Sequence, residues 1–287
     1  MPNWQERLAH DTNPAVRAEH VLRYRSAAPL IASAPVWVDL GCGAGVAAVA
    51  ALGASSARHA VLVDASQAAI DEAVTSVPAQ ATTAVQADLT DAADAMRVRD
   101  AALAVGRDGT ITCFEVIEHL VSFVPVLELM VELTTDHGYT AVLSVPNDAF
   151  WTMDNPFHET MWGEGAFEEL RRMLPADHLV AHQVPVVGSA IVPDGEAKDL
   201  QPPAVTVAAE RVPSHFIAAF GPRAQELAPQ AFAAPADLDG QRLWERQREA
   251  NLAFLEAEAA RLRSQDPPGA RQALKRRVRD VLSGDRA

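Results

Sequence analysis

The chain has 287 residues, of which 49% are hydrophobic and 22% charged, and its formal net charge is -14. This length allows one large α/β domain with a modest addition and a sizeable core. Because proteins bind phosphate backbones mainly through lysine and arginine, the acidic balance argues against nucleic acid as the main substrate.

The cysteine content and the distribution of apolar residues indicate the cellular compartment. The two cysteines, Cys42 and Cys113, are typical of a reduced protein rather than a disulfide scaffold. The N-terminus has no apolar signal region, and no apolar run reaches the length of a membrane span. We therefore expect a cytoplasmic protein without a membrane span.

Residues 1–35 are expected to form an N-terminal helical lid. Pro14 suits the first position of a helix that runs from Ala15 to about Ala28. Arg23 and Tyr24 lie in this helix. One interpretation is a solvated, amphipathic helix with ordinary surface ion pairs. The other is a cover over a binding cleft, in which Arg23 meets a carboxylate of the ligand.

The most informative stretch is the run 36–45, VWVDLGCGAG. A short β-prone segment ends in Asp39, and glycines follow at alternate positions before an apolar helix start. Strand, glycine turn and helix form the nucleoside- or phosphate-binding unit of Rossmann-like folds, where glycine lets the backbone approach a ligand. A carboxylate directly before the turn would repel pyrophosphate, so the motif favours a ligand that carries an ammonium group. The three glycines are Gly41, Gly43 and Gly45.

Acidic residues also follow the next two predicted strands, 60–63 and 82–86, at Asp64 and Asp88. An acid after each of three successive strands, together with the glycine turn, resembles the class I S-adenosylmethionine-dependent methyltransferases. The resemblance implies that S-adenosylmethionine is the co-substrate, with Asp64 on the ribose and Asp88 on the adenine amino group. An ordinary helix cap is the alternative interpretation of Asp88. The implied cofactor-binding residues are Arg23, Tyr24, Asp39, Gly41, Gly43, Gly45, Asp64, Ala65, Asp88, Leu89, Phe114 and Glu115.

A second stretch, 110–120, reads TITCFEVIEHL. The strand should end near Phe114, and Glu115, Glu118 and His119 then follow at i, i+3 and i+4, so that one helical turn would place all three on one face. Such a cluster at the end of a buried strand is costly unless a cation lies between its members. The stretch resembles the Phe-Glu-x-x-Glu-His segment of methyltransferases that include small-RNA terminal methyltransferases and ubiquinone-pathway O-methyltransferases, some of which bind a divalent ion there.

The loop 150–162 follows the predicted strand 139–145 and is expected to open over the same cleft. His158 in this loop is a candidate fourth ligand, and Mg²⁺ or Mn²⁺ is the expected ion. In the metal mechanism, His119 or His158 takes the proton if it is not a ligand. In the alternative without a metal, Glu115 lies near the methionine moiety of the cofactor, Glu118 caps or pairs on the surface, and His119 alone is the base. A loop that its aromatic residues simply fix to the surface is the other interpretation of this segment. The predicted metal set is Glu115, Glu118, His119 and His158, and the predicted catalytic set is His119, Glu118 and His158.

The fold expected from these elements is a Rossmann-like α/β domain over residues 36–222. Its seven-stranded sheet is mostly parallel, and strands near 180–187 and 214–220 complete it, the last running antiparallel. A helical extension over 223–287 includes a charged helix near 238–263. That helix is expected to pack on its own domain or to pair with a second copy in a homodimer.

The expected activity is O-methylation of a saccharide hydroxyl, assisted by a divalent metal because a sugar hydroxyl is only weakly acidic. The stretches EHVLRY, FEVIEH and NPFH resemble methyltransferases of polysaccharide and glycan pathways, such as those that make methylated mannose or glucose polysaccharides. The acceptor would be a small molecule or an oligosaccharide. Alternatives are a small aromatic or polyketide metabolite, an RNA 3′ terminus, and a non-catalytic binding protein.

Overall fold

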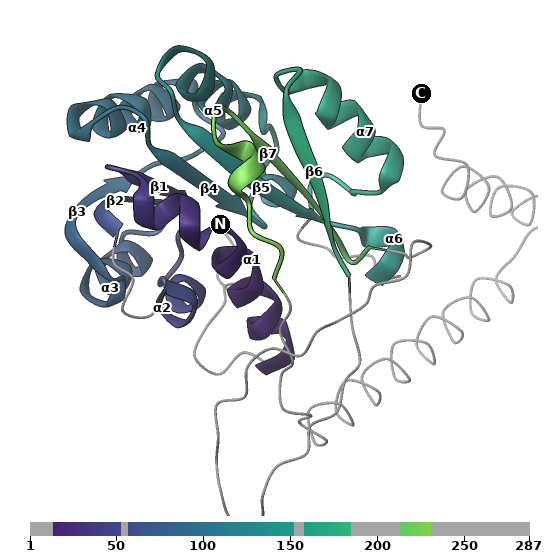
Figure 1. Ribbon diagram of the computed structural model, residues 1–287, viewed down its shortest axis with the longest axis horizontal. Helices are drawn as coiled ribbons and strands as arrows, with labels where there is room; N and C mark the ends of the chain where they lie inside the picture. The colour runs from purple at the N-terminus through teal and green to yellow at the C-terminus, as the bar shows by residue number, and fades with distance from the viewer. Residues whose placement is uncertain (1–13, 53–56, 152–157, 185–212, 231–287) are drawn as a thin grey trace, which may run out of the picture. The chain divides into compact units, whose positions relative to one another are not determined.

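A seven-stranded sheet forms the centre of the part of the chain that the structure describes, residues 14–52, 57–151, 158–184 and 213–230 of a computed structural model (Figure 1). The strand order is β3-β2-β1-β4-β5-β7-β6. Pairings from β3 to β5 are parallel, whereas β7 runs antiparallel between β5 and β6. The prediction of a mostly parallel sheet with an antiparallel last strand is confirmed. The strands are β1 (Trp37–Leu40), β2 (Ala57–Asp64), β3 (Ala79–Gln86), β4 (Thr110–Phe114), β5 (Thr140–Pro146), β6 (His178–Gln183) and β7 (His215–Phe220).

Helices cover both faces of the sheet (Figure 1). One hydrophobic core joins the sheet to α4, α5 and α7, and a second core joins the opposite face to α1, α2 and α3. This three-layer arrangement leaves the carboxyl ends of the parallel strands as the edge where loops gather, which is where ligands bind in such folds. The helices are α1 (Pro14–Ser33), α2 (Val46–Leu52), α3 (Gln67–Ser76), α4 (Ala92–Val105), α5 (Val124–Asp136), α6 (Asp148–Trp151) and α7 (Glu164–Met173).

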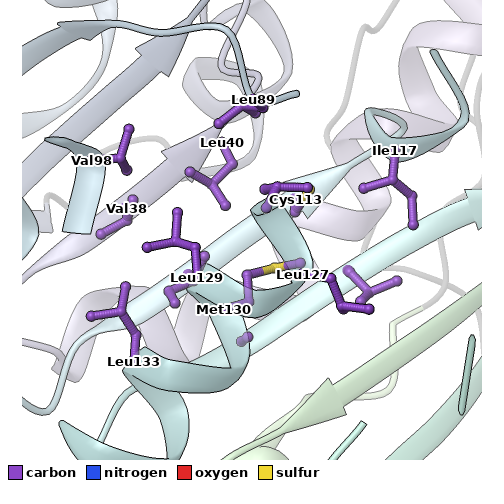
Figure 2. Close-up of a cluster of buried hydrophobic side chains, with 14 of the residues drawn as sticks. Val38, Leu40, Leu89, Val98, Cys113, Ile117, Leu127, Leu129, Met130 and Leu133 are labelled. Atoms are coloured by element: carbon purple, nitrogen blue, oxygen red, sulfur yellow. The ribbon is translucent and has the colours of Figure 1, made fainter. Parts of the chain in front are cut away.

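The central strands are buried on both faces, and their sequences explain why. Every residue of β1, β4 and β5 is buried, as expected for parallel strands between two helical layers. Figure 2 shows Leu129, Met130 and Leu133 of α5 packed over Val38 and Cys113 of β1 and β4. A rigid centre of this kind fixes the positions of the loops that leave β1 and β4.

Polar side chains fix the starts of two helices. The Ser66 hydroxyl accepts a hydrogen bond from the Ala69 amide and caps α3. The Asp91 carboxylate caps α4 through the amides of Ala93 and Asp94, at 2.8 and 3.0 Å.

Helix α1 is longer than predicted, because it continues past Pro29 to Ser33. Proline inside a helix removes one backbone hydrogen bond. Here Leu30 and Ile31 are completely buried in the second core, and their packing extends the helix beyond the expected end at Ala28. The Ala228 amide also donates to the Ser26 carbonyl of α1, at 3.0 Å, and so links the helix to the segment after β7.

Several sequence-based expectations concern residues outside the described part of the chain. They are the helix near 238–263, the homodimer that it would form, and nearly all of the extension 223–287. The N-terminal lid and the domain boundaries stay predictions. Among the described helices, none is both long and apolar enough to cross a membrane.

Substitution of Gly221 by alanine is expected to destabilise the fold. Gly221 has a φ of +105°, and an added Cβ would collide with the backbone carbonyl oxygen of Tyr139 and lie 3.0 Å from the Thr140 Cα. Backbone atoms of a central strand cannot move aside cheaply, so we expect a loss of about 2–3 kcal/mol in the free energy of unfolding. Denaturant unfolding followed by circular dichroism measures this loss.

Gly106 provides the matched control. A Cβ at Gly106 would meet no atom within 4 Å. We expect Gly106→Ala to change the unfolding free energy by no more than about 0.5 kcal/mol. Equal losses in the two variants would contradict the packing argument.

Candidate active site

The glycine turn after β1 has the backbone conformation that only glycine adopts easily. Gly41, Gly43 and Gly45 have φ values of 72°, 52° and 75°. The Asp64 carboxylate at the end of β2 accepts hydrogen bonds from the amides of Gly43, at 3.0 Å, and Ser66, at 2.8 Å. Asp64 therefore holds the turn in place and links it to the start of α3.

The three glycines have different surroundings. A Cβ on Gly43 would meet no atom within 4 Å, so the backbone there faces open space. A Cβ on Gly45 would lie 2.6 Å from Val77 Cγ2, and one on Gly41 would collide with the side chain of Val116. Gly43 is thus the point where a ligand can approach the backbone, and Gly41 is the point where the segment after β4 packs against the turn.

Asp39 lies completely buried beneath the turn. Its carboxylate accepts hydrogen bonds from the Tyr24 hydroxyl, at 3.0 Å to each oxygen, and from the Thr112 hydroxyl, at 2.6 Å. Burial raises the pKa of Asp39 to about 7, although the hydrogen bonds from Thr112 and Tyr24 lower it. Tyr24 also packs edge-to-face on Phe114, with ring centroids 5.0 Å apart. Asp39, Tyr24 and Phe114 thus form a packed support under the predicted cofactor site.

Asp88 lies at the carboxyl end of β3 and is exposed. Its Oδ1 accepts from the Thr90 amide, at 2.9 Å, and from the Thr90 hydroxyl, at 2.7 Å. Because Asp91 is the cap of α4, the alternative in which Asp88 caps that helix is wrong. The adjacent Leu89 is buried, and Ala65, after β2, is exposed. Their predicted contacts with the cofactor stay predictions.

Glu115 does not lie on a helical face with Glu118 and His119, so that prediction is wrong. Glu115 has a φ of 55°, and its amide donates to the Ser144 carbonyl of β5, at 3.4 Å, before a short 3-10 helix begins at Ile117. The left-handed residue turns the Glu115 carboxylate toward β5 and β7. There it accepts from the Ser144 hydroxyl, at 2.6 Å, and lies 3.3 Å from His215 Nε2.

Arg23 of α1 brings a positive charge to Glu115. The guanidinium is 1% exposed and donates through Nη1 to the Gln183 side chain, at 2.9 Å. Its Nε and Nη2 have no hydrogen-bond partner among the described residues. Burial acts to raise the pKa of Glu115, but Arg23 and His215 outweigh it and hold that pKa well below its usual range. Glu115 is therefore an ionised carboxylate in a cationic environment.

Glu118, His119 and His158 form a separate group of side chains that come close together. One ligand atom from each lies within 4.8 Å of the others. Glu118 is 1% exposed, and its Oε2 has no hydrogen-bond partner in the described part of the chain. Burial, together with the charge of Glu115, raises the pKa of Glu118 well above its usual value. Three of the four predicted ligands are thus brought together, and Glu115 is not among them.

Backbone contacts explain how His158 reaches the end of β4. The Glu118 carbonyl accepts hydrogen bonds from the amides of Glu159, at 2.8 Å, and Thr160, at 3.3 Å. The His119 and His158 rings then lie edge to face, with centroids 5.2 Å apart. The expectation that this loop opens over the acidic stretch is therefore correct for its second half, residues 158–162.

Four polar residues of this site are not among those predicted from the sequence. Asp148 hydrogen-bonds to His158, and Ser144, Gln183 and His215 surround Glu115 and Arg23. A signal existed for Asp148, because it directly follows the Pro-Asn pair after β5. The only sequence signal for Gln183 and His215 was their position in β6 and β7, the two strands beyond β5 in the sheet.

A comparison with protein families shows the family to which the chain belongs. A family model described as "Methyltransferase domain" matches residues 10–185, more than half of the chain. The chain belongs to this methyltransferase family. The glycine turn, the acids at the carboxyl ends of β1, β2 and β3, and the Glu118 cluster all lie within the matched residues. The predicted methyltransferase activity is therefore confirmed, and the family implies S-adenosylmethionine as the co-substrate.

Solved structures similar to this methyltransferase include the small RNA methyltransferase HEN1, with 19% identity and a TM-score of 0.49 over 79% of this chain and 28% of that chain. A SAM-dependent methyltransferase from Archaeoglobus fulgidus has 13% identity and a TM-score of 0.46 over 71% of this chain and 93% of its own. The N-methyltransferase NodS from Bradyrhizobium japonicum WM9 has 16% identity and a TM-score of 0.42 over 73% of this chain and 97% of its own. Identities below 25% and TM-scores below 0.5 do not indicate which acceptor this chain methylates. No curated protein matches the sequence.

The stability of the ligand-free methyltransferase is expected to fall as the pH rises from 5 to 8. The folded-state pKa of Asp39, about 7, lies above its ordinary value of 3.8. Between these values the folded state keeps a proton that the unfolded state has lost, so the stabilising contribution is present at low pH and disappears as the pH passes 7. Over this range we expect Asp39 to account for a loss of about 2–3 kcal/mol. Urea unfolding at each pH measures it.

Asp39→Asn removes this titration and is expected to flatten the dependence by that amount. Asp177→Asn is the matched control, because Asp177 is exposed next to the start of β6, at the opposite edge of the sheet from the site. The same pH dependence in wild type and Asp39→Asn would show that Asp39 does not titrate in this range.

Proposed function

We propose that this methyltransferase transfers a methyl group from S-adenosylmethionine to a hydroxyl group of a saccharide, with a divalent cation held by Glu118, His119 and His158. One observation carries the proposal, namely the convergence of these three side chains within 4.8 Å around a buried Glu118 whose Oε2 lacks a partner among the described residues. A buried carboxylate without a partner is costly, and a cation would compensate for that cost.

The chemistry of the three ligands favours Mn²⁺ over Mg²⁺. Mg²⁺ binds almost entirely through oxygen, whereas imidazole nitrogen suits transition metals better. A set of one carboxylate and two imidazoles therefore fits Mn²⁺, the second of the two ions expected from the sequence. Glu115 is left out of the proposed set, because Ser144 and His215 already hold its carboxylate.

The cofactor is proposed to lie across the carboxyl ends of β1, β2 and β3. Open space at the Gly43 backbone supports its passage over the turn, with Asp64 and Asp88 beside its nucleoside part. The two donors of Arg23 that have no partner among the described residues support a site for the carboxylate of its methionine part. A buried guanidinium with two available N–H groups suits a carboxylate, because it can bind both oxygens at once.

Methyl transfer requires the acceptor oxygen in line with the sulfonium methyl group. The oxygen attacks the methyl carbon, the carbon–sulfur bond breaks, and its electron pair stays on sulfur, which gives a thioether and a methyl ether. With His119 bound to the cation, the hydroxyl proton passes to water, which can reach the site because the His119 side chain is 34% exposed. A divalent cation, when bound, lowers the pKa of the hydroxyl.

The proposed cation and its three ligands favour a saccharide hydroxyl over a phenol as the acceptor. A phenol ionises readily, whereas a sugar hydroxyl needs a cation or a strong base. The net charge of -14 also favours a neutral acceptor over a polyanion.

Removal of metal ions is expected to reduce methylation strongly. We expect chelator-treated enzyme to regain turnover with Mn²⁺ more fully than with Mg²⁺, and Glu118→Gln to lose about 100-fold, because a metal Lewis acid contributes several kcal/mol to a transition state. In the assay, the enzyme is incubated with labelled S-adenosylmethionine and a panel of mono- and oligosaccharides, phenols and an RNA 3′ end. Mass spectrometry then locates the transferred methyl group.

Asp177→Asn is the control in this assay, because it removes one carboxylate far from the site. Full activity in excess chelator would exclude the cation. Labelling of phenols or RNA in preference to every saccharide would exclude the proposed acceptor class.

Arg23→Met is expected to weaken binding of S-adenosylhomocysteine by about 10- to 100-fold, the usual value of charged hydrogen bonds. Methylthioadenosine lacks the amino-acid part of that ligand, so its affinity should not change. Calorimetry with both ligands on one variant separates the lost contact from any loss of fold. Equal weakening of the two ligands would refute the role of Arg23.

A further inference from the structure

We propose that Asp148 is a positioning residue that fixes the tautomer of His158 and directs its Nε2 atom toward the cation. The inference rests on the proposed cation at Glu118, His119 and His158. It adds a residue that is not among the predicted site residues and does not itself belong to the ligand set.

The carboxylate of Asp148 is held on both oxygens. Oδ1 lies 2.9 Å from His158 Nδ1, and Oδ2 accepts from the Trp162 amide at 2.5 Å. The Asp148 amide in turn donates to the Trp162 carbonyl at 2.8 Å. The side chains of Asp148 and His158 are only 6% and 9% exposed, so water hardly competes for these contacts.

The rest of the fold makes Asp148 a rigid support. Asp148 begins α6, two residues after the end of β5. The preceding Asn147 donates from its amide to the Ser214 carbonyl and from its side chain to the Pro213 carbonyl, both at 2.8 Å. Asp148 therefore sits at a fixed point of the sheet edge, and it fixes the imidazole of His158, which comes from a loop.

The contact with Asp148 determines which ring nitrogen of His158 carries the proton. An ionised carboxylate only accepts hydrogen bonds, so the imidazole must carry its proton on Nδ1. In the neutral ring the lone pair then lies on Nε2, the form in which histidine binds a metal. A carboxylate behind a histidine also fixes the orientation of the ring and makes it a better ligand.

The two histidines of the cluster therefore have different tasks. The His158 side chain is only 9% exposed and is held by Asp148, as a permanent ligand should be. The His119 side chain is 34% exposed and lies 3.9 Å from Glu118 Oε1. This contrast makes His158 the anchor of the site and leaves His119 at the side from which the acceptor and solvent approach.

Asp148→Asn tests the inference. Only one end of an amide side chain is an acceptor, so if the introduced carbonyl serves the Trp162 amide, the introduced NH₂ group faces His158 and favours the tautomer with the lone pair on Nδ1. We expect the dissociation constant for Mn²⁺, measured by calorimetry, to rise by about 10- to 100-fold. Affinity for S-adenosylhomocysteine and the unfolding midpoint should change little, and Asp177→Asn should bind Mn²⁺ like wild type.

Two outcomes separate the inference from the proposed function. If wild type does not bind Mn²⁺, the proposed function fails. If wild type binds Mn²⁺ and Asp148→Asn binds it equally well, the proposed function stands and the role of Asp148 is refuted.

A second measurement needs no variant and no metal. Long-range ¹H–¹⁵N spectra of the wild-type protein report which nitrogen of His158 carries the proton. We expect the proton on Nδ1, and a proton on Nε2 alone would overturn the inference whatever the metal data show.

Discussion

The contact between Val116 and Gly41 is the constraint on which the site depends. Val116 lies between Glu115 and Glu118 in the sequence, and its side chain fills the space that a Cβ on Gly41 would occupy. The glycine turn and the acidic segment are thereby held against each other by close packing rather than by a flexible linker. Methyl transfer gains most from such fixed geometry, because donor and acceptor must meet in line.

Two carboxylates three residues apart acquire opposite characters from their surroundings. Arg23 and His215 keep Glu115 ionised, whereas burial and the charge of Glu115 raise the pKa of Glu118 and favour its neutral form when no cation is present. The left-handed φ of Glu115 is the cause, since it sends one side chain toward β7 and leaves the other facing His158. When the surroundings of two neighbouring acids give them different pKa values, the two acids generally have different functions in the site.

Local patterns made the fold predictable, and long-range pairing limited what could be said of the site. The strands, the glycine turn and the Ser66 cap follow from neighbours in the sequence. The direction of Glu115 depends on a backbone angle that residue type does not specify. Gln183 and His215 reach Arg23 and Glu115 only because β7 enters the sheet between β5 and β6. The contact between Asp148 and His158 joins residues ten positions apart, and no local pattern specifies it.

The place of β7 in the sheet has a consequence for synthesis on the ribosome. The strands β1 to β5 emerge first and can pair among themselves, but the open edge of β5 has no partner until residues 215–220 appear. The nascent chain therefore carries an unsatisfied strand edge, a site for unwanted pairing, until β7 pairs with its neighbours.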